Sequence, residues 1–375
     1  MRVAIVRRAA NASFSMDVYA DGLVQGLRAV RPNWDIVELI PQPNPQTKRG
    51  NGWLNGICKY YQRYWSYPLS LQNQKVNLFH IIDHSDGHYI YGLKKTNKPI
   101  VVTCHDLINF LHPENIADQA RFPLISTAIW KYSAKGICES DHIVTVSDYT
   151  AKDVMKILKV EPEYITVVPD AVESSFHRLP PEHIEAIRQK YHIPHNKFCL
   201  LNVGSNHPRK NISTVLNALN ALKNQGVPVH LLKTGAEFTR EQKAFITTHQ
   251  LADCITYLGK PDRETLVQIY NAADVLLSPS LYEGFGMTVL EAMACGTPVI
   301  TSNVTSLPEV AGDAAMMVHP TDVQAIVDAV CRLHNNSTER QLLIDRGLAR
   351  VQLFTWEITA EKIAQIYETL LKGTP

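Results

Sequence analysis

The chain has 375 residues, of which 45% are hydrophobic and 19% are charged, and its formal net charge is +1. A chain of this length exceeds one ordinary hydrophobic core, and its composition is that of a globular protein with about two domains. The near-zero charge indicates no nucleic-acid partner, and no apolar run of about 18 residues is present to span a membrane.

The start of the chain and its cysteines indicate the compartment. The apolar run Met1–Val6 is too short for a signal peptide and is followed at once by Arg7 and Arg8. Seven cysteines, an odd number without a C-x-x-C pair, fit a reducing compartment better than a disulfide scaffold. We therefore expect a cytoplasmic protein.

Strands and helices alternate along the first half of the chain. Short apolar runs predict buried strands over residues 3–6, 35–40, 76–82, 99–103, 141–147 and 164–168. We expect the first helix to begin at Asp17, a favourable N-cap, and to end near Val30. The composition shifts to Pro, His, Glu and Arg over residues 171–196, which indicates a linker after a first domain of residues 1–170.

An aromatic segment, residues 53–67, lies within the first domain. As a helix it would gather six apolar or aromatic side chains on one broad face: Trp53, Ile57, Tyr60, Tyr61, Tyr64 and Trp65. Lys59 and Arg63 would lie one turn apart, and an aromatic and basic helix of this kind fits a membrane interface, which would place the protein at the inner face of the membrane. The alternative, which we favour, is a helix that packs on the sheet or lines a substrate-binding cleft.

Polar residues follow the predicted strands at their carboxyl ends, where parallel sheets bind ligands. His84 follows the third strand, and His105 with Asp106 follows the fourth. In the loop after the first strand, the small residues around Ser13 permit close approach by a bound molecule. Ser147, at the end of the fifth strand, is a favourable helix N-cap.

The second half of the chain repeats the alternation. Apolar runs predict strands over residues 197–203, 229–235, 255–259, 274–277 and 298–301. These runs place a second domain over residues 197–356, and a last amphipathic helix ends near Lys372. Gly204 follows the first of these strands, and Arg209 and Lys210 come just before a helix. Fixed cations beside a helix N-terminus suit a diphosphate, whose negative charge they stabilise.

The loop of residues 280–286 leads from one predicted strand towards a helix and holds a carboxylate. Glu283 stands at the mouth of the strand, where open α/β sheets bind ligands. Gly284 and Gly286 let the backbone approach a ligand without Cβ clashes, and we expect Phe285 between them to take part in the same binding site.

The helix that follows, over residues 288–295, opens with amides that suit an anion. We expect the amides of Met287, Thr288 and Val289 to direct unpaired N–H groups and the positive dipole end at it. Glu291 lies about one turn inside the helix, within reach of sugar hydroxyls. A diphosphate joined to two polyols would satisfy all these groups, so the sequence predicts a site for a nucleotide-sugar.

The stretch Leu281–Ile300 resembles the E-x7-E donor motif of the retaining group 1 glycosyltransferases, the family that includes sucrose, glycogen and phosphatidylinositol-mannoside synthesising enzymes. The resemblance is strong from about Asn202 to Pro320 and looser before Pro99. It implies that Glu283 contacts the donor sugar and that Glu291 contacts the nucleotide ribose.

The same resemblance assigns roles to residues in other segments. It implies that Arg209 and Lys210 bind the donor diphosphate. It also implies that backbone groups near Gly259 and Lys260 hold the nucleotide base. His105 would reach over a cleft to the donor sugar or the acceptor.

The fold implied by the resemblance is GT-B, an α/β architecture of two Rossmann-like domains facing across a cleft. The first domain would bind the acceptor, with Ser13, His84 and Asp106 on the acceptor side, and the second domain would bind the donor. The helix over residues 357–375 would pack back on the first domain. The sequence contains no Asp-x-Asp triplet, which holds a metal ion in the other major glycosyltransferase architecture. We therefore expect no metal, and no cofactor besides the nucleotide-sugar co-substrate.

These observations predict a retaining, metal-independent hexosyltransferase that uses a UDP- or GDP-sugar and a hydroxyl acceptor. One alternative is a nucleotide-sugar epimerase of the same architecture, which would form product from the donor alone. The other is a non-catalytic glycosyltransferase-like binding protein. The donor base and sugar, the acceptor, the linkage and the oligomeric state stay open.

Overall fold

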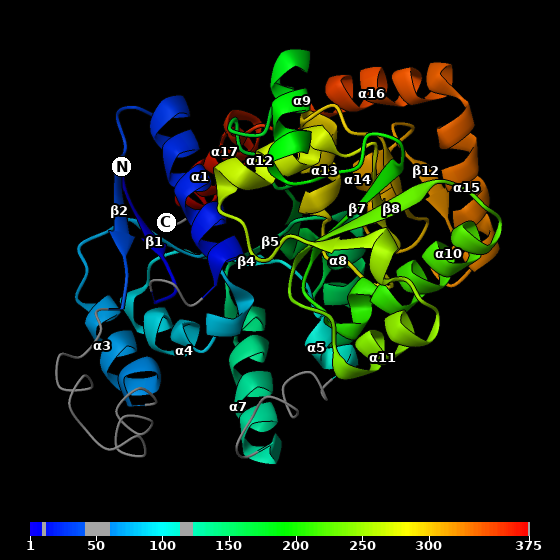
Figure 1. The fold of residues 1–375 in the computed structure, drawn as a ribbon. Helices are drawn as coiled ribbons and strands as arrows, with labels where there is room; N and C mark the ends of the chain where they lie inside the picture. Colours follow the sequence, from blue (N-terminus) through cyan, green and yellow to red (C-terminus); the bar gives the residue numbers. More distant parts are fainter. Residues whose placement is uncertain (10–12, 42–60, 113–122, 374–375) are drawn as a thin grey trace, which may run out of the picture. The chain divides into compact units, whose positions relative to one another are not determined.

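The structure is a computed structural model that describes residues 1–9, 13–41, 61–112 and 123–373. The chain divides into two compact units, one formed by Met1–Ala171 with Trp356–Pro375 and the other by Val172–Thr355. Each unit contains one six-stranded sheet with helices around it (Figure 1). The predicted α/β class and the two Rossmann-like domains are confirmed.

The sheet of the first unit has the strand order β2-β1-β3-β4-β5-β6. Its strands, each parallel to its neighbours, are β1 (Arg2–Val6), β2 (Asp35–Leu39), β3 (Leu78–Ile81), β4 (Ile100–Cys104), β5 (His142–Thr145) and β6 (Ile165–Val167). The central strand β4 is buried along its whole length. Because helices cover both faces of such a sheet, the strands appear in the sequence as continuous apolar runs rather than alternating ones.

Short and long helices surround this sheet. They are α1 (Phe14–Val30), α3 (Tyr67–Gln72), α4 (Tyr89–Leu93), α5 (Ile108–Leu111), α7 (Pro123–Lys135), α8 (Asp148–Asp153) and α17 (Trp356–Lys372). The predicted start of the first helix at Asp17 is wrong, because α1 begins at Phe14 with Ser13 at the N-cap position. Asp17 lies in the first turn instead, where its charge favours the helix dipole and its amide donates to the Ser13 carbonyl at 3.1 Å.

Helix α17 lies directly against α1 in the first unit. Its apolar residues Ala360, Ile363, Ala364 and Tyr367 belong to the same buried cluster as β1 and α1. Two glycines on α1 allow the helices to approach closely. A Cβ on Gly22 would meet the Trp356 ring at 2.0 Å, and a Cβ on Gly26 would meet the Trp356 carbonyl oxygen at 2.6 Å.

We expect the substitution Gly26→Ala to lower the free energy of unfolding by about 1–3 kcal/mol, because the new methyl group forces a backbone shift in α17. This loss should exceed the modest gain from the higher helix propensity of alanine. Denaturant titration measures the change. The control Gln25→Ala, on the exposed face of α1, should alter stability by less than about 0.5 kcal/mol. Equal stability of Gly26→Ala and wild type would contradict close packing of the two helices.

The sheet of the second unit has the strand order β12-β11-β10-β7-β8-β9. Its parallel strands are β7 (Phe198–Gly204), β8 (Val229–Gly235), β9 (Ile255–Tyr257), β10 (Val275–Ser278), β11 (Val299–Ser302) and β12 (Met316–Val318). The order places β7 beside β10, although more than 70 residues separate them in the sequence. It therefore brings the carboxyl ends of two distant strands together.

Eight α-helices and two short 3-10 turns accompany this sheet in the described part of the second unit, and one of the turns is η9 (Ala252–Cys254). The α-helices are α9 (Pro181–Lys190), α10 (Ile212–Asn224), α11 (Arg240–Thr248), α12 (Arg263–Ala272), α13 (Met287–Ala294), α14 (Leu307–Ala311), α15 (Val323–Asn335) and α16 (Ser337–Val351), and the other 3-10 turn is η8 (Pro208–Lys210). Most of the predicted linker, residues 171–196, is part of this unit. Within it, Arg188 of α9 pairs with Asp274 at 2.8 Å, so the segment is fixed beside β10.

Of the predicted aromatic helix over residues 53–67, residues 53–60 lie outside the described residues. From Gln62 to Ser66 the chain forms a π-helical turn, η2, that leads into α3. Tyr64 packs inward with its ring 4.4 Å from that of His88, whereas Trp65 is 63% exposed. The segment thus packs against its own unit on one side and exposes aromatic surface on the other. Among the helices of the described residues, none combines the length and the apolar character needed to cross a membrane.

Candidate active site

Glu283 is the centre of a buried charge cluster in the second unit. It lies in the loop between β10 and α13, and only 6% of its surface is exposed. Its Oε1 accepts a hydrogen bond from Lys210 Nζ at 2.6 Å, and its Oε2 accepts one from Arg209 Nη1. Arg209 Nη1 also donates to the Tyr282 carbonyl at 3.0 Å. Two cations predicted to bind a diphosphate therefore converge on the carboxylate predicted to contact the sugar.

Backbone contacts hold the two loops of this cluster together. The Leu281 amide donates to the Arg209 carbonyl at 2.7 Å, which joins the loop after β10 to η8. On the other side, Glu283 donates its amide to Thr305 Oγ1 at 3.2 Å and accepts from Ser306 Oγ at 2.9 Å. The loop is thus fixed on both sides, so the position of the carboxylate does not depend on its side-chain bonds alone.

The charge state of Glu283 follows from its neighbours. Burial alone would favour the neutral acid, but Lys210 and Arg209 outweigh it and hold the pKa of Glu283 at about 2. The group is therefore ionised at neutral pH and can accept hydrogen bonds from sugar hydroxyls. A diphosphate that enters this site would compete with Glu283 for both cations.

The start of α13 follows directly in the chain. Gly286 takes a φ of +118°, which suits glycine, and a Cβ there would meet Leu307 Cδ2 at 2.8 Å. The Val289 amide was predicted to direct an unpaired N–H group at an anion. This prediction is wrong, because the amide donates to the Gly286 carbonyl at 2.9 Å within the first turn. Met287 and Thr288, both half-buried, are the first two residues of the helix.

The neighbours of Glu283 on its C-terminal side belong to the core. Gly284 is buried, and Phe285 packs edge-on against Phe354 with ring centroids 5.8 Å apart. Phe285 was predicted from its place in the loop to contact the donor, a role that stays a prediction. In this structure its ring anchors the loop.

Glu291 lies one turn inside α13 and is held by a residue that the sequence did not indicate. Tyr270 of α12 is buried and donates its hydroxyl to Glu291 Oε2 at 2.6 Å. Burial raises the pKa of Glu291, and the Tyr270 hydrogen bond opposes that shift. Tyr270 therefore orients one carboxylate oxygen of Glu291 and favours its ionised form.

Replacing Tyr270 with phenylalanine should weaken nucleotide binding about tenfold, because Glu291 loses a hydrogen bond worth about 1.5 kcal/mol. Calorimetry with UDP and GDP measures the change. Tyr191→Phe is a matched control, since its hydroxyl donates to Gln268 of the same helix α12 at 3.1 Å. A Tyr270→Phe protein that binds both nucleotides as tightly as this control would show that Glu291 needs no such support.

Three glycines form the carboxyl edge of the sheet next to this cluster. Gly204, at the end of β7, accepts a hydrogen bond from the Ala236 amide at 3.1 Å. Gly235, at the end of β8, lies so close that a Cβ on it would meet the Gly204 oxygen at 2.2 Å. Its amide donates to the carbonyl of Gly259 at 2.7 Å, while Lys260, the next residue, is exposed. The predicted donor residues Gly204 and Gly259 thus lie on one continuous edge.

His105 follows β4 in the first unit. Its Nε2 donates to the Ile82 carbonyl at 2.9 Å, which fixes the ring and leaves Nδ1 towards Asp170 Oδ2 at 4.0 Å. The Tyr19 ring packs edge-on against it with centroids 4.7 Å apart. Burial, partly offset by His105, raises the pKa of Asp170 to about 6. The residue predicted to touch donor sugar or acceptor is therefore held in one orientation.

The other predicted acceptor-side residues have mainly structural contacts. Asp106 Oδ1 accepts from the Ile108 amide at 3.1 Å and so begins α5. His84 is buried, with its Nδ1 3.6 Å from Asp83 Oδ1. Ser13 precedes α1, and its Oγ lies 3.3 Å from that of Ser15. The structure brings His84 and His105 to the same carboxyl edge of the first sheet.

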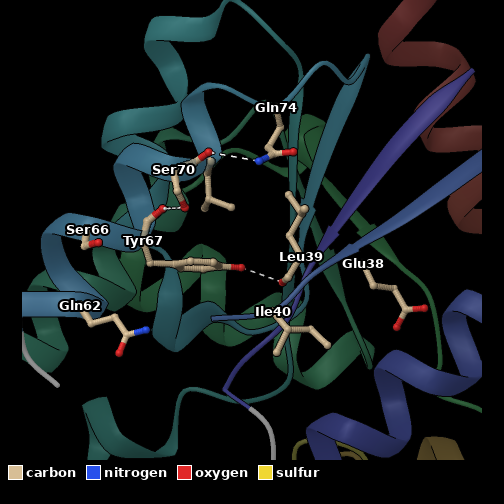
Figure 2. Close-up of a pocket in the computed structure, with 9 residues that line it drawn as sticks. Glu38, Leu39, Ile40, Gln62, Ser66, Tyr67, Ser70 and Gln74 are labelled. Carbon is tan, nitrogen blue, oxygen red and sulfur yellow. Dashed lines mark hydrogen bonds between the residues drawn. The ribbon is translucent and has the colours of Figure 1, made fainter. Parts of the chain in front are cut away.

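A cavity of about 420 Å³ opens near the carboxyl end of β2 in the first unit (Figure 2). It is lined by Glu38, Leu39, Ile40, Gln62, Ser66, Tyr67, Ser70, Leu71 and Gln74. Figure 2 shows the Tyr67 hydroxyl donating to the Leu39 carbonyl at 2.7 Å, which ties α3 to the strand. The hydroxyl and amide groups of this lining suit a polyhydroxylated ligand, whereas the Glu38 carboxylate accepts from Arg7 Nη1 at 2.7 Å.

The described residues contain no group of three or more His, Cys, Asp or Glu side chains arranged to hold a metal ion. In the second unit, Arg209 and Lys210 bring positive charge to Glu283.

Two Rossmann-like units, each with one parallel sheet, define the GT-B class of glycosyltransferases. A family model described as glycosyl transferases group 1 matches residues 183–350, and one described as glycosyltransferase family 4 matches residues 4–176. The O-antigen chain mannosyltransferase B of Escherichia coli is 31% identical over 274 residues, which is 72% of this chain and 70% of that protein. The chain belongs to the group 1 glycosyltransferases.

Other relatives extend this similarity. The serotype-specific mannosyltransferase WbdA of Escherichia coli is 27% identical over 318 residues, which covers 82% of this chain but only 38% of that longer protein. The sucrose-phosphate synthase of Thermosynechococcus elongatus has the same fold, with a TM-score of 0.78 and 21% identity over 99% of both chains.

Proposed function

We propose that this glycosyltransferase moves a hexosyl group, with mannosyl as the first choice, from a UDP- or GDP-sugar to a hydroxyl acceptor, with retention of anomeric configuration. The observation that supports it most is the convergence of Arg209 and Lys210 on the buried carboxylate of Glu283, beside the start of α13. The choice of mannose follows the names of the relatives from Escherichia coli.

In the proposed reaction, the bond from the sugar C1 to the diphosphate oxygen breaks as the acceptor oxygen attacks from the same face. Positive charge develops on the sugar ring and negative charge on the leaving diphosphate. Arg209 and Lys210 stabilise the leaving group, and Glu283 accepts hydrogen bonds from sugar hydroxyls. The leaving phosphate takes the proton from the acceptor hydroxyl, so the step needs no metal ion.

The remaining site residues bind and orient the substrates in this proposal. Glu291, held by Tyr270, accepts from the nucleotide ribose. Backbone groups near Gly259 and Lys260 hold the base. His105 contacts the donor sugar or the acceptor through Nδ1, since its Nε2 is bonded to a backbone carbonyl.

We propose a glycan as the acceptor, and the polar cavity beside β2 supports this choice because sugar hydroxyls match its lining. The exposed side chains of Tyr61 and Trp65 lie near that cavity and offer apolar surface at a membrane face. This surface suits a glycan acceptor that is attached to a lipid. The proposed compartment is the cytoplasm, which agrees with the unpaired state of the cysteines in the described residues.

A panel of UDP- and GDP-sugars, incubated with and without glycan acceptors and followed by mass spectrometry, tests this function. We expect nucleotide release and a hexosylated product that depend on the acceptor, and NMR of the product should show the anomeric configuration of the donor. A changed sugar formed from the donor alone would indicate an epimerase. Binding of the donor without turnover on any acceptor would indicate a binding protein.

A further inference from the structure

Lys233 is a buried charge that the proposed transfer step does not use. It lies near the end of β8, and 0% of its surface is exposed. Its Nζ donates hydrogen bonds to the carbonyl oxygens of Gly204 and Thr234, each at 2.8 Å. Both acceptors lie at the carboxyl edge of the second sheet, the edge that contains the candidate donor site.

The folded state destabilises the charged form of Lys233 relative to its neutral form. Burial, and then the charge of Lys210, lower the pKa of Lys233 from 10.5 to about 8. Between pH 8 and 10.5 the unfolded chain therefore binds more protons than the folded one, and the free energy of unfolding rises with pH across that window. At neutral pH the charge of Lys233 consequently opposes folding, which is typical of groups retained for function.

Strands β7 and β9 and the turn η8 each place a polar or charged residue beside Lys233. Asn202 is its register partner on β7, and Tyr257 is its partner on β9, with the hydroxyl donating to the Gly235 carbonyl at 2.9 Å. Lys210 approaches from η8. Among the residues that the structure describes, no carboxylate pairs with Lys233, so its charge is not neutralised within the fold.

Lys233 and Lys210 both lie close to Gly204, the last residue of β7. A Cβ built on Gly204 would lie 3.9 Å from Lys210 Nζ, while the Gly204 carbonyl is held by Lys233. The chain then runs through η8 to Arg209. Lys233 thus fixes the start of the loop that presents both cations, and its charge lies in a dry region where electrostatic interactions are weakly screened.

We propose that Lys233 is a positioning residue of the donor site, which holds the Gly204 strand end and strengthens the binding of a nucleotide diphosphate through its charge. This role rests on the proposed function, because it requires a diphosphate beside η8. A bound dianion favours the ammonium form over the neutral amine. Donor binding therefore raises the pKa of Lys233, and the protein takes up a proton from the buffer.

Calorimetric titration with GDP-mannose and with UDP-glucose, in buffers of different ionisation enthalpy, measures this uptake. We expect roughly half a proton per bound donor at pH 8 and almost none at pH 6.5. Lys233→Met should abolish the uptake at pH 8 and weaken donor binding about tenfold at pH 7. Lys210→Met removes the neighbouring charge that lowers the pKa of Lys233, so it should move the uptake to higher pH.

Lys223→Met is the matched control, because Lys223 also donates to a backbone carbonyl, that of Gln250, but from an exposed position. It should bind donor and take up protons as the wild type does. Wild-type binding without proton uptake at pH 8 overturns the role of Lys233, and this measurement needs no variant to fold. Unchanged affinity and uptake in Lys233→Met overturn it as well. If the wild type binds neither donor, the proposed function itself fails.

Discussion

Glutamine in place of Glu283 should lower the rate of hexosyl transfer by about 10²- to 10³-fold, while the binding of free UDP or GDP is kept or strengthened. The carboxylate is buried, and Lys210 and Arg209 keep it ionised with a pKa of about 2. Glutamine has nearly the same size but no charge. Sugar hydroxyls then lose a charged acceptor in the transition state, whereas Arg209 and Lys210 lose the partner that competes with the diphosphate.

Initial rates with a GDP- or UDP-sugar, together with calorimetry of the free nucleotides, separate these two effects. Glu185→Gln provides a control of the same chemistry, because Glu185 is an exposed residue of α9 that lies 3.5 Å from His195 and accepts a hydrogen bond from Gln189 at 3.0 Å. It should leave rate and affinity at the wild-type level. Full activity of Glu283→Gln would show that the Glu283 carboxylate has no role in the transfer reaction. A loss of nucleotide affinity as large as the loss of rate would mean that Glu283 acts through the loop rather than on the sugar.

The strands were the most predictable part of this fold. In a parallel sheet covered on both faces, each strand is an uninterrupted apolar run, and β4 is buried along its whole length. The first helix was less predictable, because Ser13 and Asp17 are both favourable N-caps and the sequence alone does not choose between them. The structure uses Ser13, and Asp17 then lies in the first turn.

The pairing within the candidate site depends on strand order, which local sequence patterns do not contain. Arg209 and Glu283 are 74 residues apart, and they meet because β7 lies beside β10 in the sheet. The sequence placed each residue at a strand end, and parallel sheets bind ligands at that edge. It did not show that Arg209 and Lys210 both pair with the Glu283 carboxylate.

Tyr270 and Lys233 could not be predicted because their importance depends on partners from other elements. Tyr270 ends an ordinary amphipathic helix in the sequence, and only the packing of α12 on α13 brings its hydroxyl to Glu291. Lys233 follows the apolar run of β8 and resembles the exposed end of a strand. A lysine two residues before the strand-end glycine Gly235 was the one available signal.

Removing the side chain of Arg209 should reduce transfer by about 10²- to 10³-fold and also weaken donor binding, in contrast to Glu283→Gln. One guanidinium nitrogen donates to both Glu283 and the Tyr282 carbonyl, so Arg209 fixes the loop as well as supplying charge. Arg209→Lys keeps the charge but cannot span both acceptors with the same planar geometry. We therefore expect lysine to restore part of the binding and little of the rate.

A double-mutant cycle of Arg209→Ala with Glu283→Gln tests whether the two residues act as a unit. Because the two side chains are hydrogen-bonded to each other, we expect the double variant to be only slightly less active than the less active of the two single variants. Two losses that multiply would show that the hydrogen bond between them plays no part in transfer, and that Arg209 acts on the diphosphate and Glu283 on the sugar independently. Near-wild-type transfer by Arg209→Ala alone would contradict the role of Arg209, which donates to both the Glu283 carboxylate and the Tyr282 carbonyl.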